Sequence, residues 1–103
     1  MLNRKTAIET ATGFINDLRL LGYNPTQAWL FGSVVSDTAH LNSDIDLALW
    51  DEKFTGVHYL DGDKIKKLLL KYKLIEFHPY PSTISEKEDP FIGEIMKTGE
   101  RIL

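Results

Sequence analysis

Apolar residues at three- and four-residue spacing mark the first predicted element, a helix over residues 4–21. This spacing places one apolar stripe along a single helix face. The stripe consists of Ile8, Ala11, Ile15, Leu18 and Leu21. Gly22 follows where a helix-ending glycine is expected. Asn24-Pro25 then predicts a turn, so the chain leaves the helix before its first short apolar run.

Three short apolar runs predict strands over residues 28–31, 45–50 and 73–78. A short helix or turn is expected over residues 33–39, and loops are expected over residues 51–56 and 81–89. The third strand takes its apolar content from Leu74, Ile75 and Phe77 and is expected to end before Pro79.

Two further helices are predicted in the second half of the chain. Residues 61–72 carry an apolar stripe of Ile65, Leu68 and Leu69, and Asp61 or Asp63 can cap the helix start. Pro90 suits the first position of a helix that runs to Thr98 and ends at Gly99.

The element order is helix, strand, short helix, strand, helix, strand, helix. It predicts an α/β (α+β) fold in which a small mixed sheet packs with helices. With 103 residues, the chain has the length of one domain over residues 1–103.

The composition is that of an ordinary globular protein, 43% hydrophobic and 26% charged. The absence of cysteine excludes disulfides, thiolate metal sites and a cysteine nucleophile. No apolar stretch approaches the ~18 residues needed to span a bilayer, and the N-terminus lacks a signal-peptide pattern, so we expect a cytoplasmic protein without a membrane partner. The net charge of −3 gives no strong nucleic-acid signal. The basic cluster of Lys64, Lys66, Lys67, Lys71 and Lys73 is interpreted as a solvated helix face.

Asp44 and Asp46 stand one residue apart among apolar neighbours, in Ser43-Asp44-Ile45-Asp46-Leu47. Residues i and i+2 of a strand share a face, which would place the two Cα atoms about 6.5–7 Å apart. Two anions this close repel unless a cation lies between them, and Mg²⁺ prefers carboxylate oxygen. Taken alone, an Asp-x-Asp pair is more simply a pair of solvated acids on a strand.

Gly32-Ser33 follows the strand expected over residues 28–31. A glycine there lets the backbone approach a ligand closely, and a turn at the start of a helix can bind phosphate. Taken alone, Gly32-Ser33 is more simply an ordinary strand-to-helix turn with Ser33 as the cap. A phosphate cradle and a paired-carboxylate strand would, however, be separated by only a ten-residue connection.

Together these residues resemble the nucleotidyltransferase superfamily that includes DNA polymerase beta, and in particular its small members called minimal nucleotidyltransferases. The family pattern is a strand, Gly-Ser, a spacer, and Ser-Asp-x-Asp-hydrophobic on the next strand. Here it reads Gly32-Ser33, nine residues, then residues 43–47. The similarity in length and element order covers nearly the whole chain and implies the polymerase beta-like fold.

The resemblance implies an enzyme that binds a nucleoside triphosphate, expected to be ATP, with Mg²⁺ and transfers the nucleotidyl group. Gly32, Ser33 and Ser43 would bind the nucleotide. Asp44 and Asp46 would hold the metal. Glu76 would be the third acid, which also helps to activate the attacking hydroxyl. We expect Glu76 on the face opposite Ile75 and Phe77; its simpler interpretation is an exposed strand acid.

The chain departs from the family pattern at three positions. Ser36 and Asp37 stand where the spacer commonly carries arginine and glycine, and Glu76 stands where aspartate is more frequent. The missing arginine removes a phosphate-facing cation. We therefore expect this departure to weaken triphosphate binding and turnover more than it affects the fold.

Four other residues receive structural interpretations. His40 in the spacer is expected on a surface loop, although it lies within reach of a phosphate. His78 is expected beside a strand end in a structural role. Trp29 and Trp50 are expected in the core or at a strand edge, rather than as stacking platforms for bases.

Minimal nucleotidyltransferases similar to this chain commonly act beside a helical HEPN-type toxin, which they silence by attaching AMP to a tyrosine. The resemblance therefore implies a protein adenylyltransferase that serves as an antitoxin. The alternative is a catalytically weakened binding module that inhibits its partner by covering it. Transfer to a small molecule lacks an acceptor domain, and transfer to an RNA end lacks a basic stripe. The acceptor, the preferred nucleotide and the oligomeric state stay open.

Overall fold

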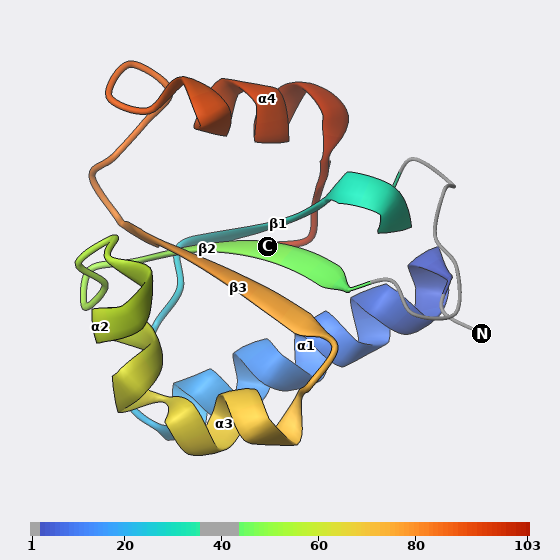
Figure 1. The fold of residues 1–103 in the computed structure, drawn as a ribbon, viewed down its shortest axis with the longest axis vertical. Helices are drawn as coiled ribbons and strands as arrows, with labels where there is room; N and C mark the ends of the chain where they lie inside the picture. Colours follow the sequence, from blue (N-terminus) through green and yellow to red (C-terminus); the bar gives the residue numbers. More distant parts are fainter. Residues whose placement is uncertain (1–2, 36–43) are drawn as a thin grey trace.

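A four-stranded mixed sheet with the order β3-β2-β1-β4 lies at the centre of the structure (Figure 1). The structure is a computed structural model that describes residues 3–35 and 44–103. Its elements are α1 Arg4–Leu20, β1 Gln27–Phe31, the 3-10 turn η1 Gly32–Val34, β2 Ile45–Asp51, α2 His58–Lys64, α3 Lys66–Lys71, β3 Ile75–Pro81, α4 Pro90–Thr98 and β4 Glu100–Arg101. β2 runs parallel to β3, whereas β1 is antiparallel to both β2 and β4. This architecture confirms the predicted small mixed sheet packed with helices.

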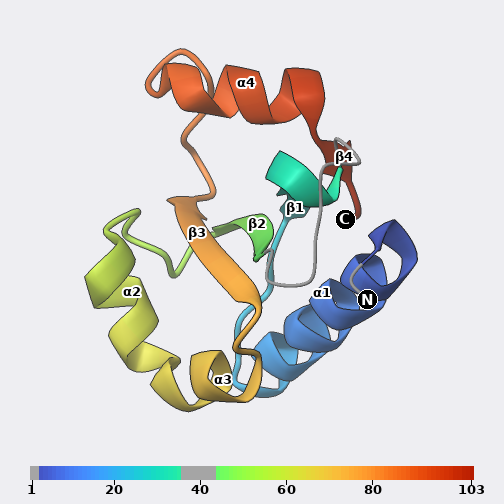
Figure 2. The same ribbon diagram turned by 45° about the vertical axis from the view of Figure 1, so that its right-hand side comes forward.

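One face of the sheet is apolar across β1, β2 and β3, and α1 and α3 cover it (Figure 2). Alternate residues of each strand point to this face because side chains alternate along a strand. The strands contribute Ala28, Leu30, Ile45, Leu47, Leu49, Ile75 and Phe77, all of them buried. Helix α1 adds Ala7, Ala11, Phe14, Ile15 and Leu18. This face, which we call the core face, holds the larger hydrophobic cluster.

The opposite face of the sheet packs against α4 (Figure 1). Its buried residues are Phe31, Ala48, Trp50 and Tyr80, together with Ile92 and Ile95 from α4. Trp50 is fully buried and stacks on Tyr80 with ring centroids 4.8 Å apart. Trp29 is partly buried in β1. Both tryptophans therefore confirm their predicted structural roles.

Helix α1 begins and ends with two capping motifs. Asn3 and Thr6 form a capping box at its start, which the apolar pattern had not predicted. At its end Gly22 adopts a φ of +94°, and the amides of Gly22 and Tyr23 bond back to the last turn as in a Schellman motif. The predicted helix stop is confirmed. The extension of the apolar stripe to Leu21 is wrong, because this side chain lies beyond the last turn and is exposed.

The helix predicted over residues 61–72 is wrong in two respects. The helical segment starts earlier, at His58, and it breaks at Ile65 into α2 and α3. Gly62 and the β-branched Ile65 are weak helix formers, and Ile65 is buried in the core at the break.

Neither Asp61 nor Asp63 caps the start of this segment, because Val57 is the N-cap residue. The buried carboxylate of Asp61 instead accepts hydrogen bonds from the amides of Thr55 and Gly56 in the preceding loop.

The strands also differ from the prediction in several places. β3 continues through Pro79 to Pro81, which is possible because β3 is an edge strand and the missing N–H need not bond a neighbour. β2 extends to Asp51, expected in a loop, whose buried carboxylate accepts the amides of Asn24 and Lys53. The two-residue strand β4 after Gly99 was not predicted at all, because its partner β1 supplies the pairing.

The C-terminal helix matches its prediction. Pro90 is the first residue of α4, Asp89 caps it through the amide of Phe91, and Gly99 ends it. Within residues 3–35 and 44–103, no helix has the length and apolar character needed to cross a membrane.

Candidate active site

Three neighbouring strands bring Phe31, Asp46 and Glu76 into one row across the sheet. Asp46 of β2 pairs with Phe31 of β1 on one side and with Glu76 of β3 on the other. Residues in register on adjacent strands share a face, so the two acids lie side by side on the face opposite the core. Glu76 is exposed, while its neighbours Ile75 and Phe77 are buried, which confirms the predicted orientation of Glu76.

Gly32 brings the end of β1 against the carboxylate of Asp46. Its φ of +79° is one that residues with a Cβ rarely adopt. An added Cβ would overlap Oδ2 of Asp46 and lie 3.3 Å from Cγ of the same side chain. Two independent constraints therefore require glycine here, namely the backbone conformation and the close approach of a carboxylate.

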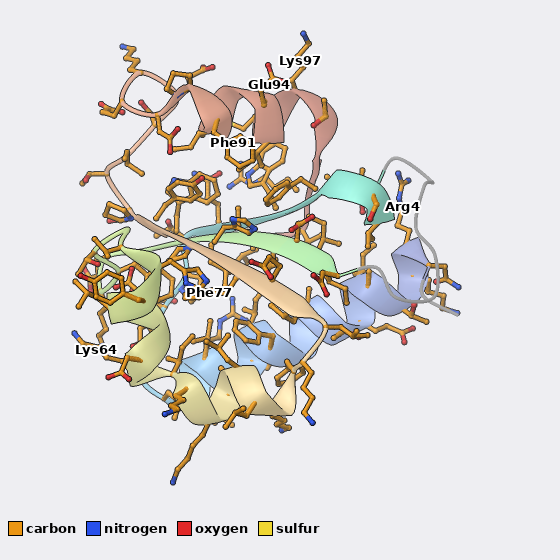
Figure 3. All side chains as sticks on the ribbon, in the orientation of Figure 1. Arg4, Lys64, Phe77, Phe91, Glu94 and Lys97 are labelled. Atoms are coloured by element: carbon orange, nitrogen blue, oxygen red, sulfur yellow. The ribbon has the colours of Figure 1, made fainter. Side chains whose placement is uncertain are left out.

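The turn after Gly32 is anchored to the rest of the fold by Arg4, at the start of α1 (Figure 3). The Arg4 guanidinium donates to the carbonyl of Val35 over 3.1 Å, and its Nε lies 3.4 Å from Glu100 of β4. The amide of Val35 in turn bonds the carbonyl of Gly32. The N-terminal helix and the last strand thus both hold the turn at this end of β1.

His78 is a site residue that the sequence analysis missed. It was expected beside a strand end, but it lies inside β3, and its Nε2 is 3.3 Å from Oδ1 of Asp46. Its ring also contacts Phe31, with centroids 4.9 Å apart. The available signal was its position two residues after Glu76, which places both side chains on the same face of β3.

The other predicted site residues lie close to this row or outside the described residues. Asp44 is exposed and immediately precedes β2. Ser33 lies inside the turn η1 rather than at its cap. Ser43, together with Ser36, Asp37 and His40 of the spacer, falls outside the described residues.

The donor set of this row suits a hard divalent cation. Mg²⁺ is usually bound through one or two carboxylates, with waters and substrate phosphates in its remaining positions. Asp46 and Glu76 offer two carboxylates on one face, with Asp44 adjacent in the chain, and the missing Cβ of Gly32 lets its backbone lie close to the Asp46 carboxylate. The residues present therefore fit Mg²⁺. Among the described residues, no group of three or more acidic, histidine or cysteine side chains surrounds one point.

Comparison with known proteins identifies the family of the chain. The sequence model of the family described as polymerase beta nucleotidyltransferase matches residues 19–103. The match covers most of the chain and includes Gly32, Ser33, Asp44, Asp46 and Glu76. No curated protein matches the sequence. The chain belongs to the polymerase beta nucleotidyltransferase family.

Proposed function

We propose that this nucleotidyltransferase uses ATP and Mg²⁺ to attach AMP to a tyrosine hydroxyl of a helical HEPN-type protein, and so acts as an antitoxin. The observation that carries the catalytic part of the proposal is the pairing of Asp46 with Glu76, with Gly32 packed on the Asp46 carboxylate. The nature of the acceptor rests on the resemblance to minimal nucleotidyltransferases described above.

The turn after β1 would bind the triphosphate. Gly32 has no side chain, so a phosphate can approach the backbone closely. Ser33 follows in the same turn and carries a hydroxyl that can donate to a phosphate oxygen. Ser43, next to Asp44 in the sequence, would add a second hydroxyl. These groups orient the triphosphate with respect to the two acids.

Asp44 and Asp46 would hold Mg²⁺, and Glu76 would either complete the carboxylate set or accept the proton of the attacking hydroxyl. When bound, Mg²⁺ neutralises the negative charge that develops on the phosphates. In the transfer, a bond forms between the acceptor oxygen and the α-phosphorus, and the bond from this phosphorus to the β-phosphate oxygen breaks. Pyrophosphate leaves, and the hydroxyl proton passes to the Glu76 carboxylate if Glu76 acts as the base, or to solvent if it completes the carboxylate set.

The experiment combines ATP labelled at the α-phosphate, Mg²⁺, the protein and a lysate of its own source cells. We expect one labelled protein band, lost with the double variant Asp44→Asn/Asp46→Asn and identified as a helical HEPN-type protein. Both substitutions remove charge with almost no change in volume, so circular dichroism should show an intact fold. Glu94→Gln on the exposed face of α4 is the matched control and should leave the label unchanged (Figure 3).

Each contrary result has a defined meaning. Label that persists in the double variant would exclude the carboxylates as the metal-binding set. Label on a different class of molecule would keep the nucleotidyl transfer and overturn the antitoxin role. No label on any macromolecule, together with ATP affinity that is insensitive to Asp46→Asn, would favour the non-catalytic binding module.

A further inference from the structure

We propose that His78 is a positioning residue that holds the Asp46 carboxylate in the orientation used for metal binding. This inference rests on the proposed function in one respect, because it takes Asp46 as a metal ligand. The geometry itself belongs to the metal-free protein. His78 lies on the edge strand β3, whereas Asp46 lies on the central strand β2, so the contact links two strands that carry different parts of the site.

The two oxygens of Asp46 have different neighbours. Oδ1 lies 3.3 Å from Nε2 of His78, and Oδ2 lies on the side where Gly32 omits a Cβ. One oxygen is thus held by a ring on β3, and the other is directed to the turn after β1. A carboxylate held at one oxygen keeps a defined rotamer, which leaves its second oxygen aimed at the turn that would bind the triphosphate.

The sheet makes room for the His78 ring to reach Asp46. The residue directly opposite His78 on β2 is Ala48, whose small side chain leaves space above the strand. The ring leans over this position and meets Phe31 of β1, with centroids 4.9 Å apart and planes at 62°. Phe31 in turn contacts Phe91 of α4. His78 is therefore held by packing as well as by its polar contact, and its side chain is only 29% exposed.

The direction of the hydrogen bond follows from the chemistry of the groups. An ionised carboxylate only accepts, so Nε2 of His78 must carry the hydrogen. The distance of 3.3 Å is slightly long, as is common for site hydrogen bonds before a substrate binds. Partners that orient a metal-binding carboxylate typically change metal affinity 10- to 100-fold when they are removed. We expect an effect of this size for His78.

Three variants test the role of the donor. His78→Phe keeps the ring beside Phe31 and removes the N–H, whereas His78→Gln keeps an amide donor at similar reach. His58→Phe is the matched control, because it makes the same change in a histidine at the start of α2 that packs against Phe77 of the core face. Each protein is titrated with Mn²⁺, which accepts the same oxygen ligands as Mg²⁺ and is quantified by electron paramagnetic resonance.

The expected result is a 10- to 100-fold weaker Mn²⁺ affinity for His78→Phe and a change of only a few-fold for His78→Gln and His58→Phe. Unchanged affinity in His78→Phe would overturn the proposal. Equal losses in both His78 variants, with ¹⁴N coupling in the pulsed spectrum of Mn²⁺ bound to the wild type, would make His78 a ligand instead.

A measurement without metal separates this inference from the proposed function. The ring nitrogens of His78 are observed by ¹H–¹⁵N correlation in the metal-free wild type at alkaline pH. A proton on Nε2 supports the proposal, and a proton on Nδ1 alone overturns it. If the wild type binds no Mn²⁺, the proposed function fails. The nitrogen spectrum of the wild type, together with the change in chemical shift of the Gly32 amide in His78→Phe, then still decides whether His78 holds Asp46.

Discussion

The two faces of the sheet use acidic side chains in opposite ways. On the side of the core face, two acids have defined partners: Asp51 accepts two backbone amides, and Asp17 of α1 accepts Lys71 and Tyr72. On the other face, Asp46 and Glu76 lie in one row, with Glu76 exposed. The acids of the core side stabilise turns and helix contacts, whereas the site row keeps carboxylate oxygens accessible to a ligand.

This difference has a physical basis. A buried carboxylate must be hydrogen-bonded, because leaving it without partners costs several kcal/mol. Two neighbouring carboxylates such as Asp46 and Glu76 repel each other, and this repulsion is relieved when a cation binds. Acids on the core side should therefore affect stability, and acids of the site row should affect binding and transfer.

The largest expected effect separates the two acids of β2. Asp46→Asn should lower nucleotidyl transfer about 1000-fold, as the loss of a main electrostatic group at a reaction centre does, with little change in stability. Asp51→Asn, on the same strand, should leave transfer per folded molecule unchanged. It should lower the free energy of unfolding by about 1–3 kcal/mol, because one backbone amide loses its acceptor. Transfer assays and urea titrations of both variants measure the contrast; equal profiles would contradict it.

The next effect compares the faces through Leu47 and Glu76. Leu47 is fully buried on the core face, so Leu47→Ala should lower the free energy of unfolding by about 2–5 kcal/mol. Glu76→Gln should change that free energy by no more than about 0.5 kcal/mol, since the side chain is exposed. Glu76→Gln should nevertheless lose transfer. Chemical denaturation and the labelled-ATP assay are carried out on both variants. A loss of stability in Glu76→Gln would count against the assignment of Glu76 to the site.

A smaller effect distinguishes two glycines with positive φ. Gly22→Ala and Gly32→Ala should each cost about 1–2 kcal/mol of stability from the left-handed backbone alone. A Cβ at Gly22 meets only the flexible end of Lys53, whereas one at Gly32 displaces the Asp46 carboxylate. Only Gly32→Ala should therefore reduce Mn²⁺ affinity as well. Matching affinities in the two variants would show that the close approach at Gly32 has no role in binding.

The smallest effect concerns acid stability on the core side. The hydrogen bonds from Lys71 and Tyr72 hold the pKa of Asp17 below its ordinary value. The stabilisation is complete above the unfolded-state pKa of about 4 and is lost as the pH falls through the lower folded-state pKa. Asp17→Asn should therefore have a lower urea midpoint than the wild type at pH 7, and the two midpoints should converge in strong acid. A difference between the two urea midpoints that persists in strong acid would show that Asp17 acts through packing and not through its charge.

The apolar pattern of the sequence predicted the elements better than it predicted their limits. The strands over residues 28–31 and 45–50, the helix after Pro90 and the helix stop at Gly22 were confirmed, because local spacing and turn residues determine them. The continuation of β3 through Pro79 and the short strand β4 depend on position in the sheet. The break at Ile65 likewise depends on which side chain the core accepts.

The candidate site likewise contains residues that the local sequence predicted and a contact that depends on the tertiary structure. Gly32-Ser33, Asp44 and Asp46 were predicted from spacing and residue type, which are properties of a local sequence, and Glu76 was predicted from the family resemblance. The contact between His78 and Asp46 joins two strands, and the two residues are 32 positions apart in the sequence. It depends on the β2–β3 register, on the small side chain of Ala48 and on the Phe31 ring. Sequence alone determined which chemical groups are available at this end of the sheet. Only the tertiary structure decided which side chain orients the Asp46 carboxylate, because the register of the strands is set by packing between them.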